Sequence, residues 1–509
     1  MRPRRLVPIV FLAIVALAAC NSTTRSGKGL DVGHLTASPT GTAGGVGPDQ
    51  SSSPVPGASG AAPGSGQPGG FGAAGPGGGS PGSTGSGGVA GGPGGGGLSA
   101  SAPARYVAGV RGITPTAIRI GVRFVSQQGA AAFTAATGTV GVNPGDTKAM
   151  AQAMVDDINS RGGLGGLKVQ PYYLEYDVTK ILTQQTAAEN QRHCEYFAHD
   201  AKVFAVVSGV PGDAVLAGCM AAFRLPYVQD AVSPYMDNTV MKQTYGYFYT
   251  PAEPNASRMA RFWIDGLNGE GFFGGGSKVG LVRLSGTTQD RVSKFDIKPE
   301  LARIGHPLTS EVQLSDAQQA SEGVLQFRAA GIDRVLILDD SSLVAQVWMN
   351  DAESQAYRPR YGLNSINAPE VLVHNAPANQ LNNALGVGWY HPYDVPSVPA
   401  AEISPAEHHC VDLMKAHGIV SADTVSYGLM IYTCDVFSFL EAAWARVPRF
   451  DEAGLLAGAE GLGNSWATSA TFAAQFGSGR LDGTAAVRNF AYDGGCKCFV
   501  YRGQPYAVG

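Results

Sequence analysis

Histidine and cysteine residues near position 410 are the first candidates for chemistry in this sequence. His408, His409 and Cys410 are consecutive, and these residue types bind zinc, but no second cluster at ligand spacing accompanies them. The alternative, which we favour, is a surface helix whose Cys410 forms a disulfide with Cys434. We therefore expect these residues to be structural and expect no metal site.

The glycine-rich segment GFFGGGSK, residues 271–278, superficially resembles a phosphate-binding loop. In that loop the lysine precedes a serine or threonine, and the segment joins a strand to a helix. Here Ser277 precedes Lys278, and the glycines come before the strand KVGLVRL. The sequence also has no GxSxG elbow, no HExxH and no recognisable pair of catalytic carboxylates. We therefore predict that the protein is not an enzyme and uses no cofactor.

Polar residues at the ends of buried strands are better candidates for function. Their side chains suit the binding of a ligand. Ser208 and Gly209 follow the apolar strand VFAVVSGV and precede a helix. A serine hydroxyl and the first amides of a helix together suit a ligand carboxylate. The alternative is that Ser208 and Gly209 only shape a turn.

Two later strands end in the same way. Thr287, Thr288 and Gln289 follow KVGLVRL, while RVLILDD ends in Asp339 and Asp340 and is followed by Ser341. The carboxyl ends of parallel strands meet at one edge of a sheet, where ligands of α/β proteins bind. We expect these side chains to line that edge.

The elements that must position these residues alternate as βαβ units from about Val107 onward. The apolar pattern predicts a first strand over Ala117–Phe124 and a helix over Thr147–Ser160, with Asp146 or Thr147 as its cap. Similar strands and helices follow to the end of the chain. This pattern predicts an α/β protein with mainly parallel sheets flanked by helices.

The first 104 residues have a different composition. Arg2, Arg4 and Arg5 precede an apolar run that is too short to cross a membrane and ends LAAC at Cys20. Residues from about 29 to 104 are dominated by Gly, Ser, Pro and Ala, which predicts a flexible linker. A coil of this kind has a root-mean-square span on the order of 45 to 50 Å.

Net charge and cysteine content limit the partners and the compartment. The net charge is −4, and no basic run interleaved with aromatic residues occurs, so we expect no nucleic-acid partner. Six cysteines follow Cys20, and in an oxidising compartment an even set predicts disulfides. Cys496 and Cys498 are two residues apart, about 6.6 Å in an extended chain, so a bond between them needs a local turn, and we assign them no partner.

Four segments of the folded region are informative as a set: ITPTAIRIGV, INSRGGLGGLKVQPYYLEYD, VFAVVSGVPGDAVLAGC and LPYVQDAVSP. They resemble substrate-binding proteins of the branched-chain amino-acid type, which have the type I periplasmic-binding-protein fold. The resemblance covers about residues 112–509. The closing segment RLDGTAAVRNFAYDGGCKCFVYRG resembles a lipoprotein subset of that family. The LAAC sequence also resembles a lipobox, which implies a lipid on Cys20.

The resemblance implies two α/β lobes joined by three hinge crossings, with GWYHPYDVP as the second. It places the first lobe at about residues 113–250 and 392–480, and the second at about 251–391 and the C-terminal tail. Residues 1–20 would be the signal peptide, 21–104 the tether and 105–509 the solute-binding domain. The resemblance also implies a disulfide between Cys194 and Cys219.

The resemblance further implies a ligand cleft between the lobes, with contacts from the segment Asp230–Ser233. The strand PRYGLN ends at Asn364, where amino-acid binders of the family place an acidic side chain for the ligand ammonium. Asn364 carries no charge, although Asp340 could substitute. An ordinary α-amino acid is therefore less expected than an amide, a polar organic acid or an aromatic solute.

The function expected from these features is capture of a small polar solute outside the cell membrane and its delivery to an ABC-type permease. The alternative is a sensory or interaction lipoprotein that uses the same fold as a receptor, because fold alone does not separate the two. The expected contact residues are Ser208, Gly209, Asp230, Ser233, Thr288, Gln289, Asp340, Ser341 and Asn364.

Overall fold

The computed structural model describes residues 105–181, 185–230, 236–315, 319–339 and 342–509, which belong to one compact unit. The expected signal segment, Cys20 and the linker lie outside the described residues, as do Ser233, Asp340 and Ser341. Within the described ranges, no helix combines the length and the apolar character needed to cross a bilayer.

The first lobe is built on a five-stranded parallel sheet in the order β2-β1-β3-β4-β5. Its strands are β1 (Ala117–Phe124), β2 (Lys168–Glu175), β3 (Ala205–Ser208), β4 (Tyr227–Gln229) and β5 (Phe248–Tyr249). Every residue of β3 is buried, as expected for a central parallel strand covered on both faces.

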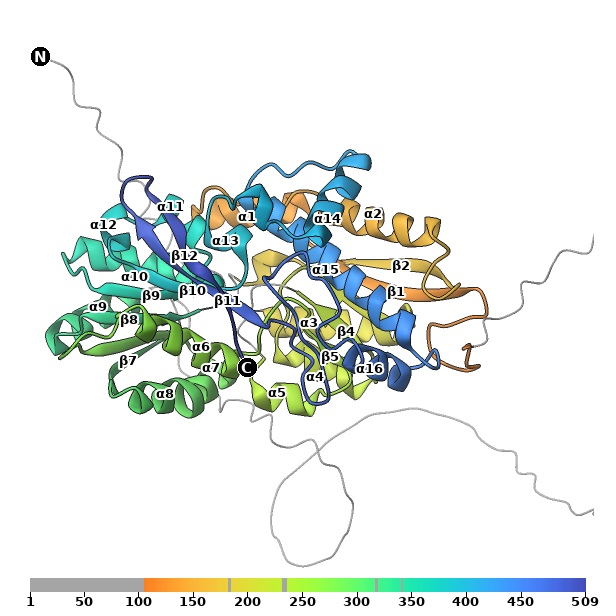
Figure 1. The fold of residues 1–509 in the computed structure, drawn as a ribbon, viewed down its shortest axis with the longest axis horizontal. Helices are drawn as coiled ribbons and strands as arrows, with labels where there is room; N and C mark the ends of the chain where they lie inside the picture. The colour runs from red at the N-terminus through yellow and green to blue at the C-terminus, as the bar shows by residue number, and fades with distance from the viewer. Residues whose placement is uncertain (1–104, 182–184, 231–235, 316–318, 340–341) are drawn as a thin grey trace, which may run out of the picture. The chain divides into compact units, whose positions relative to one another are not determined.

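The second lobe has a seven-stranded sheet in the order β12-β11-β10-β9-β8-β6-β7. Its strands are β6 (Val279–Leu284), β7 (Leu308–Leu314), β8 (Arg334–Leu338), β9 (Arg360–Asn364), β10 (Leu385–Gly388), β11 (Ala486–Asp493) and β12 (Cys498–Ala507). The strands β6 to β10 are parallel, whereas β11 and β12 form an antiparallel hairpin at one edge. Figure 1 shows this hairpin in dark blue beside β10.

Helices flank both sheets. Those associated with the first sheet are α1 (Gln127–Thr137), α2 (Thr147–Ser160), α3 (Thr186–Glu195), α4 (Ala214–Ala222), α5 (Asn238–Gln243), α14 (Pro405–Ala416), α15 (Thr424–Arg446) and α16 (Glu452–Glu460). Those associated with the second are α6 (Ala256–Gly269), α7 (Thr287–Val292), α8 (Lys298–Arg303), α9 (Gln319–Ala330), α10 (Leu343–Ser354), α11 (Pro369–Asn375) and α12 (Ala378–Leu381). The short helix α13 (His391–Asp394) lies where the chain returns to the first lobe and contacts both α11 and α15.

Local sequence explains two helices that pack together on the first sheet. Asp146 caps α2 by accepting a hydrogen bond from the amide of Ala149, and Met150, Met154 and Ile158 bury one face. The long helix α15 begins with a capping box and packs on α2 and β3. The part of the chain that follows β10 therefore returns to the first lobe and supplies one of its covering helices.

The chain passes between the lobes three times. The first crossing follows β5 and runs from Thr250 to Asn255, and the second follows β10 through Trp389 and Tyr390. The third runs from Leu481 into β11 and pairs with the first, because the amide of Gly483 donates to the carbonyl of Thr250 at 2.8 Å. Strand β10 ends at Gly388 and His391 already begins α13, so the second crossing is short.

Candidate functional site

The candidate site lies between the lobes, at the carboxyl ends of strands of both sheets. The chain leaves the first sheet at the carboxyl end of β5 and leaves the second at the carboxyl end of β10. Residues that follow β4 and β6 also contact one another across the gap. Loops at these strand ends are therefore the elements positioned to hold a ligand.

Two direct contacts join the lobes on either side of the hinge. Arg291 of α7 forms a bidentate ion pair with Asp237 before α5, and its Nη2–Oδ1 distance is 2.9 Å. Asn375 at the end of α11 bonds the backbone of Val140 twice, accepting from its amide at 2.9 Å and donating to its carbonyl at 3.0 Å. The structure therefore has the lobes in contact, as in a closed state of a two-lobed binder.

The hinge is held by a buried carboxyl from the first crossing. Glu253 accepts a hydrogen bond from Trp389 Nε1 of the second crossing at 2.8 Å and another from the hydroxyl of Tyr432 on α15. Tyr390 stacks on Tyr432 with ring centroids 4.0 Å apart. Burial raises the pKa of Glu253 to about 8, so the group is largely protonated at neutral pH.

A second buried carboxylate anchors the third crossing. Asp482 accepts hydrogen bonds from the amide of Asn255 at 2.9 Å and from its Nδ2 at 3.0 Å, and it pairs with Arg258 of α6. These contacts tie the third crossing to the start of the second lobe. The hinge crossings are thus held by a network of buried polar contacts.

The Ser208 loop lies at the carboxyl end of β3, as expected, but its hydroxyl is used within the loop. Ser208 is buried, and its Oγ donates to the carbonyl of Val210 at 2.8 Å. The helix that follows is capped by Asp213, whose carboxylate accepts from the amide of Leu216 at 2.9 Å. The Asp213 side chain thus takes up one of the N-terminal amides that we had expected to attract a ligand carboxylate.

The positive charge beneath this loop comes from Arg123 in β1 instead. Its Nη1 donates to the carbonyl of Pro211 at 3.0 Å and to the hydroxyl of Tyr227 at 2.9 Å, and its Nε donates to His193 Nδ1 at 3.2 Å. Burial, with help from the nearby Arg123 charge, lowers the pKa of His193 to about 3, so the imidazole is neutral. Because Nδ1 accepts from Arg123, the ring proton lies on Nε2, which faces Glu189 Oε1 at 3.1 Å.

A cavity of about 10 Å³ lies between the Ser208 loop and α15 and is lined in part by Arg123, Ser208, Gly209 and Thr433. A space of that size holds about one water molecule. Gly209 keeps the loop close to the helix, because a Cβ there would lie 3.1 Å from Thr433 Oγ1. This cavity is therefore too small for an organic solute.

Thr288 and Gln289, two of the residues expected from the second lobe, are buried at the start of α7. Thr288 Oγ1 accepts a hydrogen bond from Arg291 at 3.2 Å, and the Gln289 side chain folds back over Gly286. Exposed polar side chains at this strand end are Ser285 and Thr287. Thr288 and Gln289 thus support the turn after β6 and the interlobe arginine.

Asn364 and Asp230 also have structural contacts. The Asn364 side chain caps a short turn by accepting from the amide of Ile366 at 2.9 Å. Asp230 is fully buried and accepts from the amide of Ala252 in the first crossing at 2.7 Å. Burial raises the pKa of Asp230 well above its ordinary value, with a further contribution from Asp435. In this arrangement both residues shape the floor of the gap.

Three disulfides are present. Cys194–Cys219 joins α3 to α4, and Cys410–Cys434 joins α14 to α15, as expected from the sequence. The sulfur of Cys410 is therefore bonded and not available as a thiolate ligand for zinc. Cys496 and Cys498, for which we had no partner, are bonded to each other with a Cα–Cα distance of 5.2 Å.

Sequence reasoning missed the residues that link the lobes. Asp237 and Arg291 are separated by more than fifty residues, and neither belongs to a motif. A usable signal existed for Arg123 and Glu253, because each is a charged residue in an otherwise apolar or proline-rich segment. Such isolated charges are seldom buried without partners.

Comparison with known proteins gave matches at the level of structure. No protein-family model matches the chain, and no curated protein sequence does. A branched chain amino acid ABC transporter from Thermus thermophilus, solved with bound valine, has a TM-score of 0.56 and 12% identity, over 77% of this chain and 96% of its own. A fatty acid ABC transporter substrate-binding protein from Thermomonospora curvata has a TM-score of 0.57 and 13% identity, over 79% and 96%.

A third similar structure, the solute binding protein of an ABC transporter from R. palustris, was solved with 4-hydroxybenzoate. It has a TM-score of 0.55 and 11% identity, over 77% of this chain and 97% of its own. A match from Bordetella pertussis is described as a periplasmic binding protein type 1. The two-lobed α/β architecture is therefore the type I periplasmic-binding-protein fold, as the sequence resemblance implied. These neighbours are solute-binding transport proteins, and the solutes bound to them differ in chemistry.

Proposed function

We propose that this protein is an extracytoplasmic, lipid-anchored solute-binding protein that captures a small polar solute between its lobes and delivers it to an ABC-type importer. The single observation that carries the proposal is the hinge. Three crossings join the two sheets, and contacts made only between the lobes, such as Asp237–Arg291, form when the gap is closed. Ligand-driven closure of this kind reports occupancy to a partner.

The solute class follows from the polar groups at the strand ends. Arg123 gives the first-lobe wall a positive charge beneath the Ser208 loop, which favours an anionic group on the solute. No acidic side chain stands at Asn364 to pair an ammonium group. We therefore propose an amide or a polar organic acid ahead of an ordinary α-amino acid.

The test begins with the solute that the protein itself carries. The full-length protein is isolated gently in mild detergent, denatured, and the released small molecules are identified by mass spectrometry. The released compound, added back to the stripped protein, is expected to bind in calorimetry and to reduce the radius of gyration in small-angle X-ray scattering. If no amino acid, amide or organic acid binds and no compound changes the radius, the proposal is wrong.

Delivery to an importer is tested separately. The loaded protein is added to vesicles containing an ABC-type permease from the same cells, and ATP hydrolysis is measured. Stimulation by the loaded protein, and not by the stripped protein, supports transport. Binding and closure without stimulation favour the receptor alternative.

A further inference from the structure

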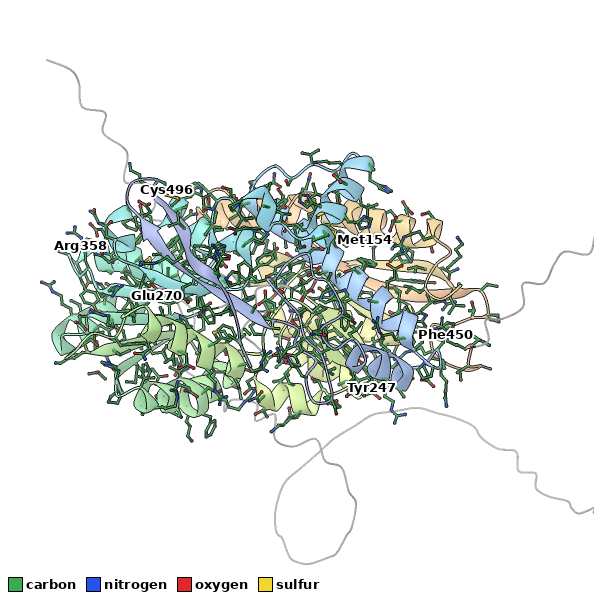
Figure 2. The ribbon with its side chains drawn as sticks, in the orientation of Figure 1. Met154, Tyr247, Glu270, Arg358, Phe450 and Cys496 are labelled. Atoms are coloured by element: carbon green, nitrogen blue, oxygen red, sulfur yellow. A yellow bond between two sulfur atoms is a disulfide. The ribbon has the colours of Figure 1, made fainter. Side chains whose placement is uncertain are left out.

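The hairpin of β11 and β12 ends in a disulfide that closes a very small ring. Gly494, Gly495, Cys496 and Lys497 form the turn, and Cys498 begins β12 opposite Asp493. Figure 2 labels Cys496 at the tip of this hairpin, at the edge of the molecule in that view. The bond joins residues two positions apart.

This bond does little to restrict the unfolded chain. Cross-linking stabilises a protein mainly by closing a loop in the unfolded state, and the effect grows with loop length. Cys194–Cys219 and Cys410–Cys434 span 25 and 24 residues, whereas Cys496–Cys498 spans 2. The β11–β12 ladder, paired from Ala486 and Ala507 to Asp493 and Cys498, already holds the hairpin together. Stabilisation of the folded state therefore does not explain the Cys496–Cys498 bond.

The third disulfide is also the most accessible of the three. Cys496 is exposed and Cys498 half-buried, while Gly494, Gly495 and Lys497 around them are all exposed. Cys194 is 0% exposed, Cys410 and Cys434 are 2% and 3% exposed, and Cys219 is half-buried. Cys496 is thus the one fully exposed cysteine among the described residues, and an attacking thiolate can reach it without any unfolding.

The backbone between the two cysteines adds a reason for the bond to open. Lys497 has a φ of +57°, in the left-handed region that non-glycine residues rarely adopt. The ring thus includes a residue in an unfavourable backbone region. The Lys497 ammonium also lies next to both cysteines in the chain, and a neighbouring cation favours the thiolate form of a cysteine.

We propose that Cys496–Cys498 is a reversible thiol–disulfide exchange site that accepts two electrons from an extracytoplasmic dithiol. A thiolate of the dithiol attacks Cys496 Sγ, the bond between Cys496 and Cys498 breaks, and Cys498 leaves as a thiolate that takes up a proton. The second thiolate of the dithiol then attacks the mixed disulfide and releases Cys496, which is protonated in turn. The products are two cysteine thiols on the protein and one disulfide on the partner.

The test uses the other two disulfides as internal controls. The folded full-length protein is exposed to dithiothreitol at neutral pH for graded times, quenched with N-ethylmaleimide and mapped by mass spectrometry. Cys496 and Cys498 are expected to be labelled at least tenfold faster than Cys194, Cys219, Cys410 and Cys434. Near-ultraviolet circular dichroism is expected to stay native, and removal of the reductant in the presence of glutathione disulfide is expected to restore the bond.

A variant separates exchange from a structural role. Cys496→Ser with Cys498→Ser is expected to leave the unfolding midpoint in urea unchanged, and Cys496 in the single variant Cys498→Ser is expected to form a mixed disulfide with glutathione disulfide. Reduction of all three bonds at the same rate would overturn the proposal. A double variant that unfolds at a clearly lower urea concentration would also overturn it, because the bond would then stabilise the folded protein.

Discussion

The Asp237–Arg291 ion pair is one of the contacts that join the two lobes of this protein. The Asp237 carboxylate is nearly buried, and Arg291 keeps about a quarter of its side chain exposed. Asp237 also caps α5 by accepting from the amide of Val240 at 2.9 Å. A substitution that removes the charge but keeps the cap therefore isolates the interlobe contribution.

We expect Asp237→Asn to weaken ligand binding about fivefold. Asparagine still caps the helix, so the loss is confined to the ion pair, at about 1 kcal/mol for a partly exposed pair. Less of the protein is then in the closed, binding-competent state, which lowers the apparent affinity. Calorimetry with the solute that the protein carries measures the change.

Arg303→Gln is the matched control, because Arg303 pairs with Asp265 and Glu300 within the second lobe. Affinity should be unchanged in that variant. Equal affinity of Asp237→Asn and the unsubstituted protein would show that the ion pair does not stabilise closure.

For single residues, the sequence predicted where the candidate site residues lie better than what their side chains contact. Ser208, Asp230 and Asn364 do lie at carboxyl ends of strands or directly after them, as the strand pattern indicated. Their side chains nevertheless bond within their own loops or to the hinge, which depends on distances that no sequence pattern contains. The ligand contacts of Ser208, Gly209, Asp230, Thr288, Gln289 and Asn364 stay predictions, as do those of Ser233, Asp340 and Ser341, which lie outside the described residues.

Among the elements, the hinge crossings are packed backbone against backbone. A Cβ at Gly483 in the third crossing would lie 1.9 Å from the carbonyl oxygen of Pro251 in the first. Such a contact cannot be relieved by a side-chain rotation. Gly483 is therefore required for the two crossings to pair.

We predict that Gly483→Ala lowers the free energy of unfolding by about 1 to 3 kcal/mol, the usual range for an overpacked site. Urea denaturation followed by circular dichroism gives the value. Gly477→Ala in the same segment is the control, since a Cβ there meets no atom within 4 Å. Similar stability of the two variants would contradict the close approach of the crossings.

The disulfide between α3 and α4 belongs to the same scale. Cys194→Ser with Cys219→Ser is expected to lower the free energy of unfolding by roughly 3 kcal/mol in the loop-entropy model, because the bond closes a loop of 25 residues. The same urea experiment measures it, and non-reducing peptide mapping checks the pairing. Finding these two cysteines free in the native protein would refute the assignment.

Elements with a clear apolar period were predicted closely, and those without one were missed. The predicted strand at Ala117–Phe124 and helix at Thr147–Ser160 coincide with β1 and α2. Helix α1 was not predicted, because Ala130 is its single buried residue among those described and its sequence has no apolar stripe. The antiparallel pairing of β11 with β12 and β10 depends on contacts across the second lobe. The order and direction of these strands could therefore not be predicted from the sequence of the C-terminal tail.

At the scale of the whole molecule, the lipid anchor proposed at Cys20 determines whether the protein stays with the membrane. LAAC closes an apolar run that is too short to span a bilayer, so a lipid on Cys20 would hold the protein at the membrane. Cys20→Ala is expected to move the protein from the membrane fraction to the soluble fraction on immunoblots. Unchanged membrane retention would end the lipoprotein proposal without affecting the fold.

Stability of the folded unit should depend on pH through carboxyls buried around the hinge. Burial raises the pKa of Glu253 to about 8, of Asp394 to about 7 and of Asp435 to about 6. A carboxyl with a higher pKa in the folded state binds its proton more tightly there than in the unfolded chain. Its contribution to stability is therefore fully present below the ordinary carboxyl pKa and is lost as pH rises through the folded value.

We predict that the free energy of unfolding decreases between pH 5 and pH 8, and that Glu253→Gln flattens this slope. One group changes the free energy by at most about 1.4 kcal/mol per pH unit, so the difference between the two proteins should change by roughly 3 to 4 kcal/mol over these three pH units. Glutamine keeps acceptor and donor atoms for Trp389 and Tyr432, and Asp394→Asn offers a second test at the other buried carboxyl.

Glu322→Gln, at an exposed position on α9, is the control and should retain the full slope. Urea titrations at each pH measure all four proteins, and a slope in Glu253→Gln and Asp394→Asn equal to that of the control would show that neither carboxyl takes up a proton on folding.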